Sequence, residues 1–189
     1  MIRSADYIEK NNIISDGKNS FVKGKKAQVG FDVSVKNIYQ QYYPGLITKK
    51  KTYVPQYVQI PVEDIKYPYT EHAGEEVSFR GWHLPKGSYL LECNEGVQFG
   101  PNDTGYFIMR SSLNRCFVTI LSALWDPGFT TQNKKEVNTI TLRLNVDSDE
   151  GIYLEQDARV AQLVVASNED TELYGKDSQF QGGRRTSSK

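Results

Sequence analysis

The chain has 189 residues, of which 23 are lysine or arginine and 23 are aspartate or glutamate, so its formal net charge is zero. This balance argues against a protein that coats nucleic acid or an anionic membrane, and the length suits one domain with a sizeable core. No apolar run is long enough to span a membrane, and Met1 to Asp6 lacks the apolar stretch of a secretory signal. We therefore expect a cytoplasmic protein with no membrane or nucleic-acid partner.

The start of the chain is the best candidate for a helix. Ser4 can cap a short helix that carries Ile8 on its apolar side, and Asn11 and Gly17 would end it. After it, short segments rich in β-branched and aromatic residues alternate with turn signals, which is typical of an all-β sandwich or barrel. The predicted strands are Gln28 to Val35, Thr52 to Ile60, Tyr89 to Cys93, Tyr106 to Met109, Phe117 to Leu121, Thr139 to Val146 and Arg159 to Val165.

Two stretches do not follow the strand pattern. Residues 39–51 mix tyrosine with a run of lysines, which indicates either a solvated sheet edge or, less commonly, a surface for single-stranded nucleic acid. Residues 174–189 are rich in glycine, serine and arginine with almost no apolar side chains. We therefore divide the chain into a β domain of residues 1–173 and a flexible C-terminal arm of residues 174–189.

Common catalytic and metal-binding motifs are absent from the sequence. Cys93 and Cys116 are far apart and outside any CxxC pattern, which favours two reduced structural thiols over a disulfide or a zinc site. His72 and His83 have no partners at metal-ligand spacing, and the chain contains neither a Walker phosphate loop, a dinucleotide-binding glycine motif nor a nucleophile elbow. The chemistry must therefore depend on other polar motifs.

Five short polar motifs occur in a fixed order at the ends of the predicted strands. They are Lys26 to Val33, Met109 to Arg115, Leu124 to Phe129, Asp157 to Leu163, and Tyr174 to Lys176 with Phe180 to Arg184. In this order they resemble the five motifs of the dUTPase and dCTP deaminase superfamily, and the layout is closer to the deaminase branch. The resemblance implies an all-β distorted jelly roll or β-barrel with a short N-terminal helix. It also implies a homotrimer whose active sites are shared between subunits and bind a deoxyribonucleoside triphosphate, dUTP or dCTP.

The second and fourth motifs carry side chains suited to a triphosphate. A dense anion is bound by guanidinium groups, hydroxyls and amide donors, so we assign Arg110, Ser111, Ser112, Arg115 and Gln162 to the phosphates. For Arg110, which we also count as catalytic, the alternative is a salt bridge at a subunit interface.

The third motif supplies the residues expected beside the sugar and the attacking water. Asp126 precedes a Pro-Gly turn, where its carboxylate could orient and deprotonate water or contact the 3'-hydroxyl, as the resemblance implies; the alternative is a turn-capping role. The resemblance places Phe129 beneath the deoxyribose, although a core aromatic is the simpler interpretation.

A metal and a closing tail complete the expected site. Hydrolysis at the α-phosphorus calls for Mg²⁺ beside the arginine donors, and Asp32 is a candidate for water-mediated contact with it or, equally, for a structural role at a strand start. The resemblance implies that the C-terminal arm closes over the nucleotide of a neighbouring subunit, with Arg184 and Arg185 on the phosphates and Tyr174 and Phe180 on the sugar or base.

Arg143 decides between the two branches of the superfamily. Alignment from the fourth motif places it where deaminases carry their catalytic glutamate, and a guanidinium cannot move protons at neutral pH. Arg143 could instead donate to a carbonyl oxygen of the base. The stretch 130–138 is longer than usual, and Glu136 within it could restore an acid. We therefore rank dUTP diphosphatase first, dCTP deaminase second and a non-catalytic nucleotide-binding homologue third.

Overall fold

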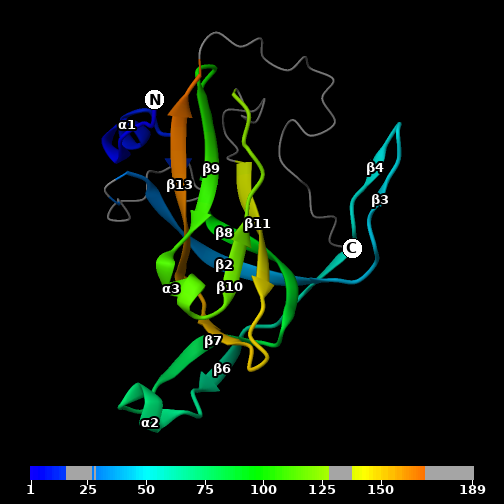
Figure 1. The fold of residues 1–189 in the computed structure, drawn as a ribbon, viewed down its shortest axis with the longest axis vertical. Coiled ribbons are helices and arrows are strands. Elements are labelled where there is room, and N and C mark those ends of the chain that lie inside the picture. The colour runs from blue at the N-terminus through cyan, green and yellow to red at the C-terminus, as the bar shows by residue number, and fades with distance from the viewer. Residues whose placement is uncertain (16–26, 28, 128–137, 169–189) are drawn as a thin grey trace.

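The computed structural model describes residues 1–15, 27, 29–127 and 138–168 (Figure 1). Its elements up to residue 84 are α1 (Ala5–Lys10), β1 (Ile14–Ser15), β2 (Phe31–Gln41), β3 (Leu46–Ile47), β4 (Thr52–Tyr53), β5 (Tyr57–Gln59), β6 (Glu63–Lys66), α2 (Thr70–Ala73) and β7 (Ser78–Leu84). The remaining elements are β8 (Gly87–Val97), β9 (Asp103–Met109), α3 (Ser111–Arg115), β10 (Val118–Leu121), β11 (Asn138–Val146), β12 (Ile152–Glu155) and β13 (Arg159–Ser167). The prediction of an all-β protein with a short N-terminal helix is confirmed.

An antiparallel sheet in the order β10-β11-β8-β2-β13-β9 forms the body of the molecule, with β1 paired to β8 and β5 paired to β2. Its two ends meet through the segment that follows β10. The Gly105 amide donates to the carbonyl oxygen of Trp125 (3.1 Å), and the Trp125 amide donates back to that of Gly105 (2.8 Å). This pair of hydrogen bonds makes the sheet a nearly closed barrel.

Alternation along the strands separates the core from the outer polar face. Ile38, Leu91 and Leu142 lie side by side on β2, β8 and β11, and none of them is more than 1% exposed. The neighbouring residues Thr141 and Arg143 point away from this core, as the alternating pattern of the strand predicts. The core therefore fixes which side chains of β8 and β11 are available to a ligand.

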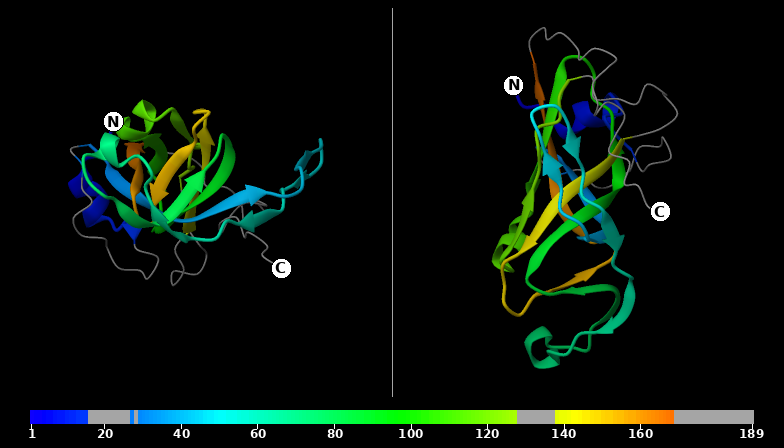
Figure 2. Two further views of the ribbon diagram at one scale, coloured as in Figure 1. Left: turned by 90° about the horizontal axis from the view of Figure 1, so that it is seen from below. Right: turned by 90° about the vertical axis from the view of Figure 1, so that its right-hand side faces the viewer.

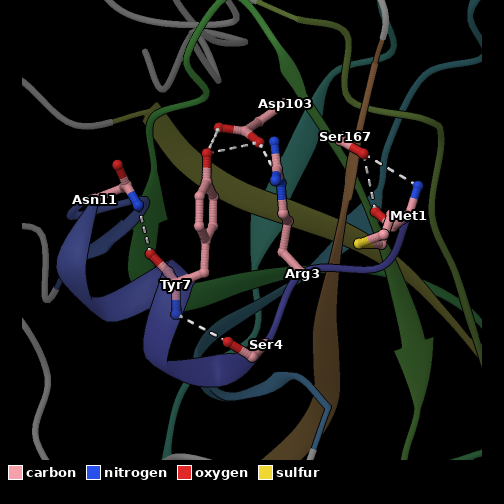
Figure 3. Close-up of polar contacts among 7 residues, drawn as sticks. All are labelled: Met1, Arg3, Ser4, Tyr7, Asn11, Asp103 and Ser167. Atoms are coloured by element: carbon pink, nitrogen blue, oxygen red, sulfur yellow. Dashed lines mark hydrogen bonds and ion pairs between the residues drawn. The ribbon is translucent and has the colours of Figure 1, made fainter.

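Polar contacts attach the N-terminal segment to the barrel (Figure 3). Ser4 caps α1 through its hydroxyl, which accepts from the amide of Tyr7 (3.2 Å), as predicted. The Tyr7 hydroxyl (3.0 Å) and Arg3 Nε (3.3 Å) both donate to the carboxylate of Asp103, which is 5% exposed at the start of β9. Partial burial and this hydrogen bond raise the pKa of Tyr7 above its usual value.

Two smaller units extend from the barrel (Figures 1 and 2). A ribbon of residues 42–56, containing β3 and β4, projects from the ends of β2 and β5. At the end of the barrel that carries α3, β12, β7 and β6 form a second sheet with α2 beyond it. Within the described ranges, no helix combines the length and apolar character needed to cross a membrane.

Candidate active site

Side chains from the first, second and fourth motifs meet around one buried carboxylate. Asp32, at the start of β2, is 5% exposed and is paired in register with Gln162 of β13. Arg159 Nη1 donates to one carboxylate oxygen of Asp32 at 3.1 Å, and Gln162 Nε2 donates to the other at 3.2 Å. Arg110 Nε lies 3.7 Å from the oxygen that Arg159 contacts. The barrel therefore assembles a group that we call the Asp32 cluster: Asp32, Arg110, Arg159 and Gln162.

The charges of the Asp32 cluster favour an anionic ligand. It holds two guanidinium groups against one carboxylate, and the side chains of Arg110 and Arg159 remain 34% and 49% exposed. Such partly exposed guanidinium groups keep donors for phosphate oxygens. Both oxygens of Asp32 accept hydrogen bonds from the protein, which supports the structural role that the sequence allowed for this residue.

The Arg-Ser-Ser turn lies at the end of β9, next to this cluster. Arg110 is the N-cap of α3, and buried Leu113 (6% exposed) holds the short helix against the barrel. Ser111, Ser112 and Arg115 are exposed on it. The hydroxyls and the second guanidinium that we assigned to phosphates thus face solvent beside Arg110.

Trp125 holds the third motif in place. In addition to its two bonds with Gly105, its carbonyl oxygen accepts a hydrogen bond from the Thr104 hydroxyl at 2.6 Å. Its ring packs edge-on against Phe107, with the ring centroids 5.8 Å apart. Asp126 follows directly and is half-buried, so the position of its backbone is set by β9.

A pocket of about 670 Å³ lies on the polar face of the barrel. It is lined by Gln41, Tyr57, residues 88–90, residues 121–126, Thr139, Thr141, Leu142 and Arg143. Asp126 and Arg143, which the sequence assigned to the sugar and base, therefore line the same cavity. Arg143 is paired in register with Leu90 and with Leu121, which places it between the middle of the sheet and the third motif.

The structure does not bring all the predicted site residues together. Arg110, Ser111, Ser112, Arg115 and Gln162 are absent from the described lining of the pocket. Five other residues, Phe129, Tyr174, Phe180, Arg184 and Arg185, lie outside the described residues, as do Glu136 and the rest of 130–137. One chain thus presents two separate groups of site residues.

A polar network beside the pocket was not predicted from the sequence. Glu92 of β8 accepts hydrogen bonds from Tyr39 (2.6 Å), Asn37 (3.0 Å) and Lys36 (3.0 Å). Burial alone would raise the pKa of Glu92, but these donors outweigh it and lower the pKa below the usual value. Burial and the bond to Glu92 raise the pKa of Tyr39 to about 12. Glu92 is paired in register with Thr141, which lines the pocket, so this acid adjoins the pocket. The sequence alone does not indicate this position, because it depends on the pairing of β8 with β11.

The nearly closed antiparallel barrel, with the motif residues on its wall and on its polar face, defines a protein of the dUTPase and dCTP deaminase superfamily. The family model described as dCTP deaminase-like matches residues 5–168, and the chain belongs to this family. The superfamily predicted from the order of the motifs is therefore confirmed.

Curated relatives come from archaea. A probable deoxyuridine 5'-triphosphate nucleotidohydrolase of Archaeoglobus fulgidus is 41% identical over 91 residues, which are 48% of this chain and 50% of that protein. A protein of the same name from Halobacterium salinarum is 30% identical over 148 residues, 77% of each chain. A further relative of the same name comes from Aeropyrum pernix. The chain spans 50% of the length of the Archaeoglobus fulgidus protein and 59% of the length of the Aeropyrum pernix protein.

Among solved structures, the 2'-deoxycytidine 5'-triphosphate deaminase from Agrobacterium tumefaciens superposes with a TM-score of 0.53. The superposition covers 87% of this chain and 47% of that chain, at 10% sequence identity. At this identity the likeness concerns the fold alone, and it agrees with the barrel described above.

Proposed function

We propose that the protein hydrolyses dUTP to dUMP and pyrophosphate. The observation that carries this proposal is the lining of the pocket, in which Asp126 is the carboxylate among the described residues and Arg143 lies beside it. The alignment of the motifs predicts a glutamate at the position of Arg143 in a deaminase. The archaeal relatives named as probable dUTP nucleotidohydrolases support the same reaction. The two cysteines, Cys93 buried and Cys116 exposed, are not joined in a disulfide, which fits the reducing cytoplasm in which we place the protein.

In this reaction the oxygen of a water molecule forms a bond to the α-phosphorus. The bond from that phosphorus to the bridging oxygen breaks, and pyrophosphate leaves with the electron pair. Asp126 would orient the water and accept its proton, while Arg143 would donate to a carbonyl oxygen of the base. A guanidinium stays protonated throughout, so it can bind the base but cannot move a proton onto an amino group.

Within one chain, the proposed water site lies far from the proposed phosphate donors. Trp125 is joined to Gly105, and Arg110 follows Gly105 by five positions along β9, roughly 17 Å of extended strand. The Arg-Ser-Ser turn of one chain is therefore too far along the barrel to serve its own Asp126. We propose that a second copy supplies this turn, in a homotrimer with three shared sites.

We propose Mg²⁺ as the metal, bound mainly through the triphosphate, whose negative charge it would neutralise. No group of three His, Cys, Asp or Glu side chains forms a metal site in the described part of the chain. Asp32 is 5% exposed, both of its oxygens accept hydrogen bonds, and two guanidinium groups lie against it, so the charge of this cluster does not fit a cation. The metal would therefore be held by the triphosphate rather than by Asp32. We also propose that residues 174–189 close over the nucleotide.

The test is to incubate the purified protein with Mg²⁺ and dUTP, dCTP or the other canonical deoxynucleoside triphosphates. We expect pyrophosphate and dUMP from dUTP. Asp126→Asn keeps the size of the side chain and removes the base, so kcat should fall by about 10²- to 10⁴-fold. The matched control is Asp147→Asn, an exposed acid outside the pocket lining. Ammonia from dCTP without pyrophosphate from dUTP, or an active Asp126→Asn enzyme, would contradict the proposal.

A further inference from the structure

The ribbon of residues 42–56 carries an unusual concentration of exposed apolar side chains. Six large ones are between 50% and 81% exposed; they are Tyr42, Tyr43, Leu46, Ile47, Tyr53 and Val54. The ribbon projects away from the barrel, as two different views show (Figures 1 and 2). Its strands β3 and β4 share only two register pairs. A two-stranded ribbon of this size has no core, and exposed apolar patches of this kind mark interaction surfaces.

The tip of the ribbon is nevertheless locally ordered. The Thr48 hydroxyl donates to the carbonyl oxygen of Lys51 (2.8 Å) and accepts from the Lys51 amide (2.9 Å). The ammonium group of Lys51 lies 4.8 Å from the centroid of the Tyr53 ring, and the rings of Tyr42 and Tyr43 pack edge to face. The apolar side chains are therefore presented on a defined turn, which lowers the entropic cost of binding a partner.

The charge of the ribbon has a complement elsewhere on the same chain. Residues 41–62 contain three lysines and no acidic residue, whereas residues 63–76 contain five acidic residues and one lysine. This second segment, which we call the acidic lobe, comprises β6, α2 and the loop up to β7, and all five of its acids are exposed. Surfaces of opposite charge guide association and fix the register of an interface.

The positions of the two surfaces suit contact between copies. The ribbon begins at the rim of the pocket, because Gln41 and Tyr57 are paired in register and both line it. The acidic lobe lies at the end of the barrel that carries α3, the helix of the Arg-Ser-Ser turn (Figures 1 and 2). The turn and the lobe therefore share one end of the barrel, and the ribbon and the pocket share one rim, so a contact between copies can involve both pairs.

From these observations we propose that the ribbon of one protomer docks on the acidic lobe of a second copy of this chain. The contact would run head to tail, with apolar side chains at its centre and the lysines of the tip against the carboxylates of the lobe. Its placement at the pocket rests on the proposed function, in which a second copy completes the site. The alternative partner for tyrosines and lysines, single-stranded nucleic acid, is an outcome of the test below.

Charge reversal tests the contact directly. The ribbon variant is Lys49→Glu with Lys50→Glu and Lys51→Glu, and the lobe variant is Glu71→Lys with Glu75→Lys and Glu76→Lys. The mass distribution of the full-length protein is measured by sedimentation over a dilution series. Either variant alone should raise the concentration at which the assembly dissociates by tenfold or more, and the six substitutions together should restore most of this loss. Ile47→Asp, at an 81% exposed side chain, should weaken the assembly without unfolding the protomer.

An assembly that withstands all of these substitutions, or a wild-type protein that is monomeric, would overturn the proposal. So would binding of a fluorescent single-stranded oligonucleotide that the ribbon variant loses while its assembly stays intact. The proposed function is tested separately, by mixing inactive Asp126→Asn with inactive Arg110→Ala. Restored dUTP hydrolysis in the mixture supports shared sites, whatever the ribbon contacts.

Discussion

Asp32→Asn tests whether the Asp32 carboxylate organises the barrel wall or mainly serves a metal. The substitution keeps the volume but removes the charge and one acceptor, so Arg159 and Gln162 can no longer both donate to it at 3.1 and 3.2 Å. Breaking a fully buried ion pair costs about 3–5 kcal/mol and an exposed one about 0–1 kcal/mol. Asp32 is 5% exposed, but its guanidinium partner Arg159 is 49% exposed and screened by solvent. We therefore expect a loss of about 1.5–3 kcal/mol in the free energy of unfolding.

Urea denaturation followed by circular dichroism, at one fixed protein concentration, measures this loss. The control is Asp149→Asn, because Asp149 forms a short ion pair with Lys86 (2.6 Å) in which both side chains are more than half exposed, and its loss should leave the free energy of unfolding nearly unchanged. The loss in Asp32→Asn should be the same with and without Mg²⁺. Unchanged stability, combined with a tenfold higher Mg²⁺ requirement for hydrolysis, would refute the structural role and support a metal ligand.

Two further substitutions test contacts beside the pocket. Thr104→Val removes the 2.6 Å hydrogen bond that holds the Trp125 carbonyl while keeping the β-branched shape, so kcat for dUTP should fall more than KM rises, and Thr104→Ser should restore it. Tyr39→Phe removes a donor to Glu92. Because the pKa of Tyr39 is raised to about 12, the stability from this bond is complete below pH 10 and lost between about pH 10 and 12. Unfolding measurements across that range should show this alkaline loss in the wild type and not in the variant; equal pH profiles would exclude the contact.

The strands that build the barrel could be predicted because each has one face in the core. The pattern from Thr139 to Val146 matches β11 (Asn138–Val146) to within one residue, since alternate side chains such as Leu142 are buried. A strand buried on one face carries its own signal in the sequence, whichever strand it pairs with.

The smaller units could not be predicted, for two physical reasons. The single strand expected from Thr52 to Ile60 is wrong, because Pro55 interrupts it and leaves β4 and β5 as separate short strands in different sheets. The sheet of β6, β7 and β12 was missed because β6 and β12 have only four residues each and β6 has no buried side chain. β12 pairs with β7 about 70 residues away, with Tyr153 opposite His83, and no local pattern indicates such a partner.

The motifs contain all four residues of the Asp32 cluster, but they did not predict the contacts among them. Asp32 and Arg159 are 127 positions apart in the sequence, and Arg159 was part of a recognised motif but was assigned no role. Its guanidinium proves to be the nearest cationic partner of Asp32. The pairing of β2 with β13, which depends on the whole barrel, brings them together.

The electrostatics of the pocket place the proposed chemistry at the phosphate end of the nucleotide. Arg143 holds a fixed positive charge on β11, and Glu92, the acid two register pairs away, is kept ionised by three donors that lower its pKa. Neither group can deliver a proton to a base near neutral pH. Asp126, held by Trp125 against β9, is the carboxylate that the described pocket offers to water. A barrel with this distribution of charge is suited to activating water beside the sugar and phosphates, and neither Arg143 nor Glu92 can deliver a proton to the amino group of a cytosine.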